Sequence, residues 1–218
     1  MRAIVESVGP AIMFAGPVIL LPLLLLPLAV LFVPQVKPAG RAVMATLDQL
    51  SGVALSAAMG MAIVMMGAQL AVVIARYAFG LAFTWLNEIV IYAFAAMFLL
   101  AAAGALRDDA HVRVDILRDR FGPKTRAMIE LVGIYLFLVP ICFLILWAAA
   151  PLVSNSWALL EGSRESDGLP FWYVFKTLIP VFAIFLLLQG ISQAIKSSLR
   201  FHEDLPDPHE HPVEPGAL

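Results

Sequence analysis

The chain has 218 residues, of which 61% are hydrophobic and 14% are charged, and its formal net charge is −2. Soluble domains carry roughly 25% charged residues, and a single water-soluble core could not hide this much apolar surface. The composition therefore predicts an integral membrane protein, and the net charge gives no indication of nucleic-acid binding.

Five apolar stretches approach or exceed the roughly 20 residues that a helix needs to cross a bilayer. The first, residues 10–34, contains Pro17, Pro22 and Pro27, each of which removes a backbone donor and bends a helix. It is longer than the apolar core of a signal peptide and no small-residue cleavage site follows it, so we predict a distorted extra helix. The other four stretches are residues 50–75, 89–106, 128–153 and 171–195.

These stretches predict an all-α fold, an integral membrane helical bundle with a four-helix core plus one extra N-terminal hydrophobic helix. We expect residues 1–44 to contain the extra helix and a connector. Residues 45–200 are expected to form the four-helix membrane domain. The last part, residues 201–218, combines prolines, acids and histidines with no apolar periodicity, so we expect a disordered tail.

The basic residues of the loops predict the orientation of the chain. Five alternating spans place ten lysines and arginines on one face, and the other four, Arg2, Arg76, Arg164 and Lys176, on the opposite face. Because cytoplasmic loops carry the basic excess, the 107–126 loop and the C-terminus are predicted to be cytoplasmic. The N-terminus is then outside if the first stretch spans the membrane.

Groups suited to catalysis are scarce in the predicted spans. Glu130 lies one turn from Arg126, which favours an interfacial ion pair, and Lys176 lies close enough to a helix end to reach the outer surface. All four histidines lie outside the spans, which argues against intramembrane haem ligation. The single cysteine, Cys142, excludes an intrachain disulfide. We expect no catalytic residue, no metal site and no cofactor.

Small residues predict a packing surface on the second stretch. Gly52, Ser56 and Gly60 recur every four residues and therefore lie on one helix face. Helices in lipid associate through such small-residue seams because the backbones can approach closely. The partner of this seam is either another helix of this chain or another subunit.

The connection "RYAFGLAFTWLNE" is rich in large aromatic side chains, which indicates an aromatic belt at the membrane surface. Glu88 opens the third stretch, where a carboxylate interacts favourably with the helix dipole. Since Arg76 lies on the same predicted face, an Arg76–Glu88 ion pair is a further hypothesis.

The segment "GALRDDAHVRVDIL" is the most charged part of the chain. Together with the preceding "WLNE", it resembles the small membrane subunit of tripartite ATP-independent periplasmic (TRAP) transporters, the DctQ-like family. The resemblance covers roughly residues 45–200. The family's motif residues fall on Trp85, Glu88, Arg107, His111, Val112, Val114 and Asp115, and the basic Arg113 lies among them.

This resemblance implies a non-catalytic subunit of the bacterial inner membrane. It implies a large TRAP permease subunit as the partner, which carries the substrate and sodium sites, and a periplasmic solute-binding protein that delivers an organic acid. Trp85, Glu88, Arg107, His111, Arg113 and Asp115 are then candidates for structural or subunit-interface roles. His111 and Asp115 either lock the fold internally or contact the large subunit. The alternatives are a standalone small transporter and the membrane anchor of a redox enzyme.

Overall fold

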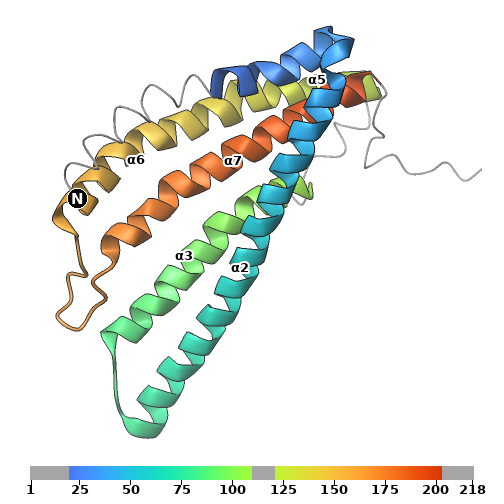
Figure 1. Cartoon of the computed structure of the whole chain (residues 1–218). Coiled ribbons are helices and arrows are strands. Elements are labelled where there is room, and N and C mark those ends of the chain that lie inside the picture. Colours follow the sequence, from blue (N-terminus) through green and yellow to red (C-terminus); the bar gives the residue numbers. More distant parts are fainter. Residues whose placement is uncertain (1–19, 110–120, 203–218) are drawn as a thin grey trace, which may run out of the picture.

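The computed structural model describes residues 20–109 and 121–202, and in these ranges the chain is helical with no strand (Figure 1). The predicted all-helical class is confirmed. Four helices are long and apolar enough to cross a membrane, and a shorter apolar helix, Leu20–Phe32, precedes them. The 110–120 segment and the 203–218 tail lie outside the described residues.

The first long helix, α2, spans Lys37–Phe79 and follows a short 3-10 turn, η1, at Pro34–Val36. Its 43 residues correspond to roughly 65 Å at 1.5 Å per residue, about twice the thickness of the hydrocarbon core. The apolar stretch 50–75 is only its second part, because the more polar residues 37–49 also favour a helix. The helix ends at Gly80, whose left-handed backbone (φ 67°) glycine adopts without strain.

The helix α3, Thr84–Arg107, returns beside α2 (Figure 1). The next span consists of α5 (Pro123–Gly133), a π-helical segment η2 (Ile134–Leu138) and α6 (Val139–Leu159). Within it the Val139 N–H bonds to the carbonyl of Ile134, five residues earlier. This wider turn comes directly before Pro140, which has no N–H to donate. The last helix, α7, spans Trp172–Phe201.

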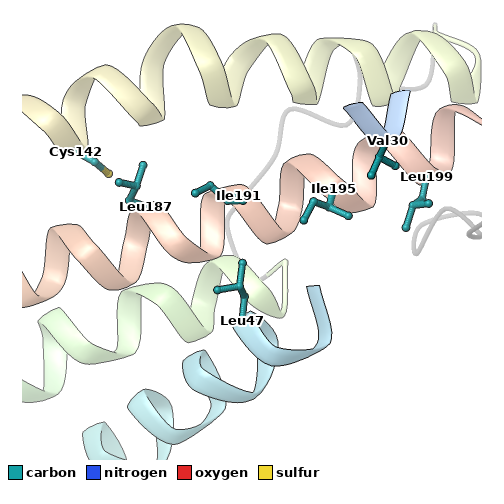
Figure 2. Packing of buried hydrophobic residues seen from close by; sticks show 7 residues of the cluster. All are labelled: Val30, Leu47, Cys142, Leu187, Ile191, Ile195 and Leu199. Atoms are coloured by element: carbon teal, nitrogen blue, oxygen red, sulfur yellow. The ribbon is translucent and has the colours of Figure 1, made fainter. Parts of the chain in front are cut away.

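The core of the bundle forms around α7. Its side chains Leu187, Ile191, Ile195 and Leu199 repeat every four residues and are almost completely buried. Figure 2 shows this row facing Cys142 of α6, Leu47 of α2 and Val30 of the first helix. Since α7 contacts α2, α3, α5 and α6, the last helix of the chain holds the others together.

The first helix is fixed to the bundle through its backbone carbonyls. Ser198 Oγ donates to the Pro27 carbonyl at 2.8 Å, and His202 Nε2 lies 2.8 Å from the Leu31 carbonyl. The Tyr135 hydroxyl donates to the Leu24 carbonyl. The described helix, Leu20–Phe32, covers roughly 20 Å, so this part alone does not cross a 30 Å hydrocarbon layer. Residues 10–19 of the predicted stretch lie outside the described residues.

Candidate functional site

Three of the predicted interface residues, Trp85, Glu88 and Arg107, lie at the two ends of α3. Trp85 and Glu88 are in its first turns and Arg107 is its last residue, which separates Glu88 from Arg107 by roughly 28 Å. His111, Arg113 and Asp115 lie outside the described residues. We call the end of the bundle with Arg107, the start of α5 and the end of α7 the basic end. The end with the 80–83 and 160–171 connections is the loop end.

At the basic end, the carboxylate of Asp48 on α2 is surrounded by donors from α7. It accepts from Gln189 Nε2 at 3.0 Å and from Ser192 Oγ at 2.7 Å. Lys196 Nζ lies 3.1 Å from one carboxylate oxygen and 2.9 Å from the other. The Gln189 amide is completely buried, and its carbonyl oxygen accepts from Ser51 Oγ at 2.6 Å. A partly buried carboxylate is tolerated when its oxygens are paired in this way, so the network fixes α2 against α7.

Arg107 extends the same network to α3. Its guanidinium donates to both carboxylate oxygens of Asp108, at 2.6 and 3.0 Å, and to the Asp48 carbonyl at 3.4 Å. The Arg107 guanidinium beside Asp108 lowers the pKa of that carboxyl below its ordinary value. A Cβ on Gly52 would lie 2.6 Å from Arg107 Nη1, so the missing side chain at Gly52 makes room for the arginine.

A second pair of charges joins α5 to α7. Glu130 accepts from Ser197 Oγ at 2.8 Å and from Arg200 Nη1 at 3.1 Å. Arg126, the partner expected from the sequence, donates through Nε to the Phe121 carbonyl at 2.8 Å. Gln193 of α7 also donates to the Leu106 carbonyl at the end of α3, at 2.6 Å. Polar side chains of α7 therefore bond to α2, α3 and α5.

At the loop end, Glu88 organises the 160–171 connection. Its side chain is buried, accepting from Ser163 Oγ and, at 2.6 Å, from the backbone N–H of Leu169. The hypothesis of an Arg76–Glu88 ion pair is wrong: within residues 20–109 and 121–202 the structure holds no such pair. The Glu88 carboxylate instead accepts hydrogen bonds from the loop that packs over it.

A second contact closes this loop. Lys176 Nζ of α7 lies 2.5 Å from Glu161, which also accepts from Ser156 Oγ at 2.7 Å. The ammonium of Lys176, followed by the hydroxyl of Ser156, lowers the pKa of the Glu161 carboxyl. Lys176 thus reaches the loop from one turn inside α7.

The aromatic residues expected at the membrane surface lie at the loop end. Tyr77 and Phe79 are largely exposed at the end of α2, and Trp85 is 38% exposed with its ring centroid 5.9 Å from that of Phe83. This position matches an aromatic belt at the boundary between lipid and water. Trp85 therefore contributes surface there rather than core.

The predicted seam lies only partly within the chain. The α2 face that is buried against the rest of the bundle includes Ser51, Ala54 and Ala58. Ser56 is exposed, and around Gly60 no described atom lies within 4 Å of an added Cβ. Gly52 lies against Arg107 of the same chain, so a contact with another subunit stays a prediction for Ser56 and Gly60.

Sequence reasoning missed most of the polar network. Asp48 lies two residues before the apolar stretch 50–75 and was not singled out from the sequence, whereas in the structure it lies eleven residues inside α2. A signal was present in the second half of α7, where polar residues recur at intervals of three and four. They are Gln189, Ser192, Gln193, Lys196, Ser197 and Arg200. This spacing predicts polar contacts along a helix face, although it does not identify their partners.

A comparison with protein-family models identifies this bundle. Residues 65–200 match the family described as "Tripartite ATP-independent periplasmic transporters, DctQ component". The chain belongs to the DctQ family. DctQ proteins are the small membrane components of TRAP transporters, so this DctQ chain is a non-catalytic transporter component rather than an enzyme. No curated protein and no solved structure matches the chain.

The DctQ match covers α3, α5, α6, α7 and the second half of α2. The helix Leu20–Phe32 and the Asp48 carboxylate lie before its first residue. In this DctQ chain, hydrogen bonds from Tyr135, Ser198 and His202 join the first helix to the helices near and within the matched part.

Proposed function

We propose that this DctQ chain packs against the large permease subunit of a TRAP transporter and holds it in place in the bacterial inner membrane. The large subunit would carry out sodium-driven uptake of an organic acid that a periplasmic solute-binding protein delivers. In this proposal the chain needs no cofactor or metal and binds no nucleic acid.

The observation that carries this proposal is the way the charges of the long helices are paired. Ionisable groups inside a membrane mark a transport path when they face a cavity or a substrate. Here Asp48 is paired with Lys196, and Glu130 with Arg200, each across two helices of the same chain. These charges are therefore used to assemble the bundle, which favours a supporting role.

The exposed side of α2 offers a surface for the large subunit. Gly60 and Gly67 have no described atom within 4 Å of an added Cβ, and Ser56 is exposed one turn before Gly60. In lipid, an approaching helix packs most closely where side chains are small. We therefore place the contact with the large subunit along this part of α2.

The basic end is proposed to be cytoplasmic, because the basic residues of a membrane protein gather on that side. The loop end then faces the periplasm. Arg164, Glu165 and Asp167 are exposed there on a loop that Glu88 holds in place. This fixed and charged loop supports a contact with the solute-binding protein.

A co-purification experiment tests the proposal. The tagged chain is expressed together with the large membrane subunit, extracted in mild detergent and captured on the tag. The wild-type chain should retain the large subunit. Gly60→Leu should reduce the retained amount by about tenfold, which corresponds to 1.4 kcal/mol lost at a close contact.

Gly133→Leu is the matched control. Gly133 is also helical with no described atom within 4 Å of an added Cβ, but it lies in α5, and this variant should retain the large subunit normally. A wild-type chain that purifies without the large subunit would contradict the proposed function. Equal retention of the large subunit by Gly60→Leu and Gly133→Leu would contradict the proposed position of the contact along α2.

A further inference from the structure

An apolar groove lies between the first helix and the α5–η2 segment. It has a volume of about 530 Å³, within the usual range for ligand sites of roughly 300–1,000 Å³. One wall is formed by Leu28, Leu31 and Phe32, and the other includes Met128, Val132 and Leu136. The first wall lies outside the part of the chain that matches the DctQ family.

The groove depends on the fixed position of the first helix. The bonds from Ser198 to the Pro27 carbonyl and from Tyr135 to the Leu24 carbonyl hold this helix beside α5. The Tyr135 hydroxyl is the polar side-chain group among the lining residues, and its proton is already donated to Leu24. The lining therefore suits an occupant that is itself apolar.

The size of the lining side chains distinguishes between two apolar occupants. Close helix packing in lipid uses glycine, alanine and serine, whereas the groove is lined by leucine, phenylalanine, methionine, valine and tyrosine. Large apolar side chains around an open groove fit a hydrocarbon chain better than a closely packed second helix. The occupant that the lining favours is the acyl chain of a lipid.

The charge next to the groove indicates the head group. Lys124 is exposed at the start of α5, one turn before Met128 and on the same helix face. A lysine at the membrane surface attracts anionic lipid head groups. We propose that the groove binds the acyl chain of an anionic phospholipid from the leaflet at the basic end, with its phosphate near Lys124.

Photocrosslinking in the assembled complex tests this site. The complex of the chain with its large subunit is placed in phosphatidylcholine nanodiscs that contain phosphatidylglycerol with a diazirine in the middle of one acyl chain. Crosslinks should map to Leu20–Phe32 and to residues 123–138 and should saturate. Unlabelled phosphatidylglycerol should compete about fivefold better than phosphatidylcholine, as expected for the attraction of one cation.

Two matched tryptophan variants locate the binding site. Val132→Trp fills the groove, and Ile141→Trp adds the same bulk on the same long helix outside the lining residues; both wild-type side chains are 51% exposed. The first variant should lose the saturable crosslink and the second should keep it. Lys124→Gln should remove the preference for phosphatidylglycerol.

Three results would overturn the inference. Crosslinks that rise linearly with lipid content and spread over the apolar surface would show ordinary bilayer contact. Unchanged crosslinking in Val132→Trp would place the lipid elsewhere. Crosslinks from these residues to the large subunit, in place of lipid, would show that a protein helix occupies the groove.

Discussion

The carboxylate of Asp48 obtains its counter-charge from Lys196, 148 residues later in the chain. Until α7 has inserted, α2 carries an acid for which the described structure offers no other basic side chain at hydrogen-bond distance. An unpaired carboxylate is costly inside a membrane. The final position of α2 therefore depends on α7, which is synthesised after it.

At this residue scale, Lys196→Met should destabilise the bundle. The variant leaves Asp48 with only the neutral donors of Gln189 and Ser192, and the loss should be about 1.5–3 kcal/mol, typical of a hydrogen bond to a charged group. Arg76→Met is the control, since Arg76 is exposed at the loop end. Equilibrium unfolding in detergent micelles measures both effects.

The double variant Asp48→Asn with Lys196→Met distinguishes the loss of the Asp48–Lys196 ion pair from general damage to the two helices. Because its two substitutions remove both charges, the double variant should lose less stability than the sum of the two single variants. Strictly additive losses would show that the two charges do not interact in the folded protein.

At the scale of elements, α2 and α3 are held close by a glycine. A Cβ on Gly104 would lie 2.9 Å from the Cβ of Leu55, so an alanine there must push the helices apart. On the exposed side of α2, Gly67 has open space around it. The same substitution therefore has opposite consequences at the two positions.

Gly104→Ala should destabilise the bundle by about 1–3 kcal/mol through overpacking. Gly67→Ala should be neutral or should stabilise α2 by up to about 1 kcal/mol, because alanine is the better helix former. Thermal unfolding of the two purified variants provides the comparison. A loss of stability in Gly67→Ala, with none in Gly104→Ala, would contradict the described packing of α2 on α3.

Hydropathy predicted the helices well where contact with lipid requires a uniformly apolar sequence. The stretches 89–106, 128–153 and 171–195 correspond to α3, to the α5–α6 span and to α7. The start of α2 was missed because residues 37–49 are helical without being uniformly apolar. A hydropathy pattern detects contact with lipid, whereas helix formation by a less apolar segment follows backbone propensity.

The polar contacts were harder to predict, since each joins residues far apart in the chain. The carboxylate of Glu88 was expected to interact with the dipole of its own helix, but it binds Ser163 and the Leu169 N–H, 75 and 81 residues away. A single sequence identifies a polar group inside a span, while its partner depends on which helices become neighbours.

At the scale of the whole molecule, the contacts are distributed unevenly. Asp48, Arg107, Glu130 and the end of α7 tie four helices together at the basic end, and the first helix joins them there. In Figure 1 the α2–α3 hairpin diverges from α6 toward the loop end. The side of α2 that carries Gly60 and Gly67 is therefore free of contacts with the described residues, which suits the proposed contact with another subunit. At the basic end, by contrast, the helices are bonded to one another.

The most direct test of the central claim is sodium entry into liposomes. The purified chain alone, with a mixture of mono- and dicarboxylic acids outside, should give the same entry of radioactive sodium as protein-free liposomes. With the large subunit and the solute-binding protein added, the same acid mixture should stimulate sodium entry. Acid-stimulated sodium entry through the chain alone would contradict its role as a supporting subunit.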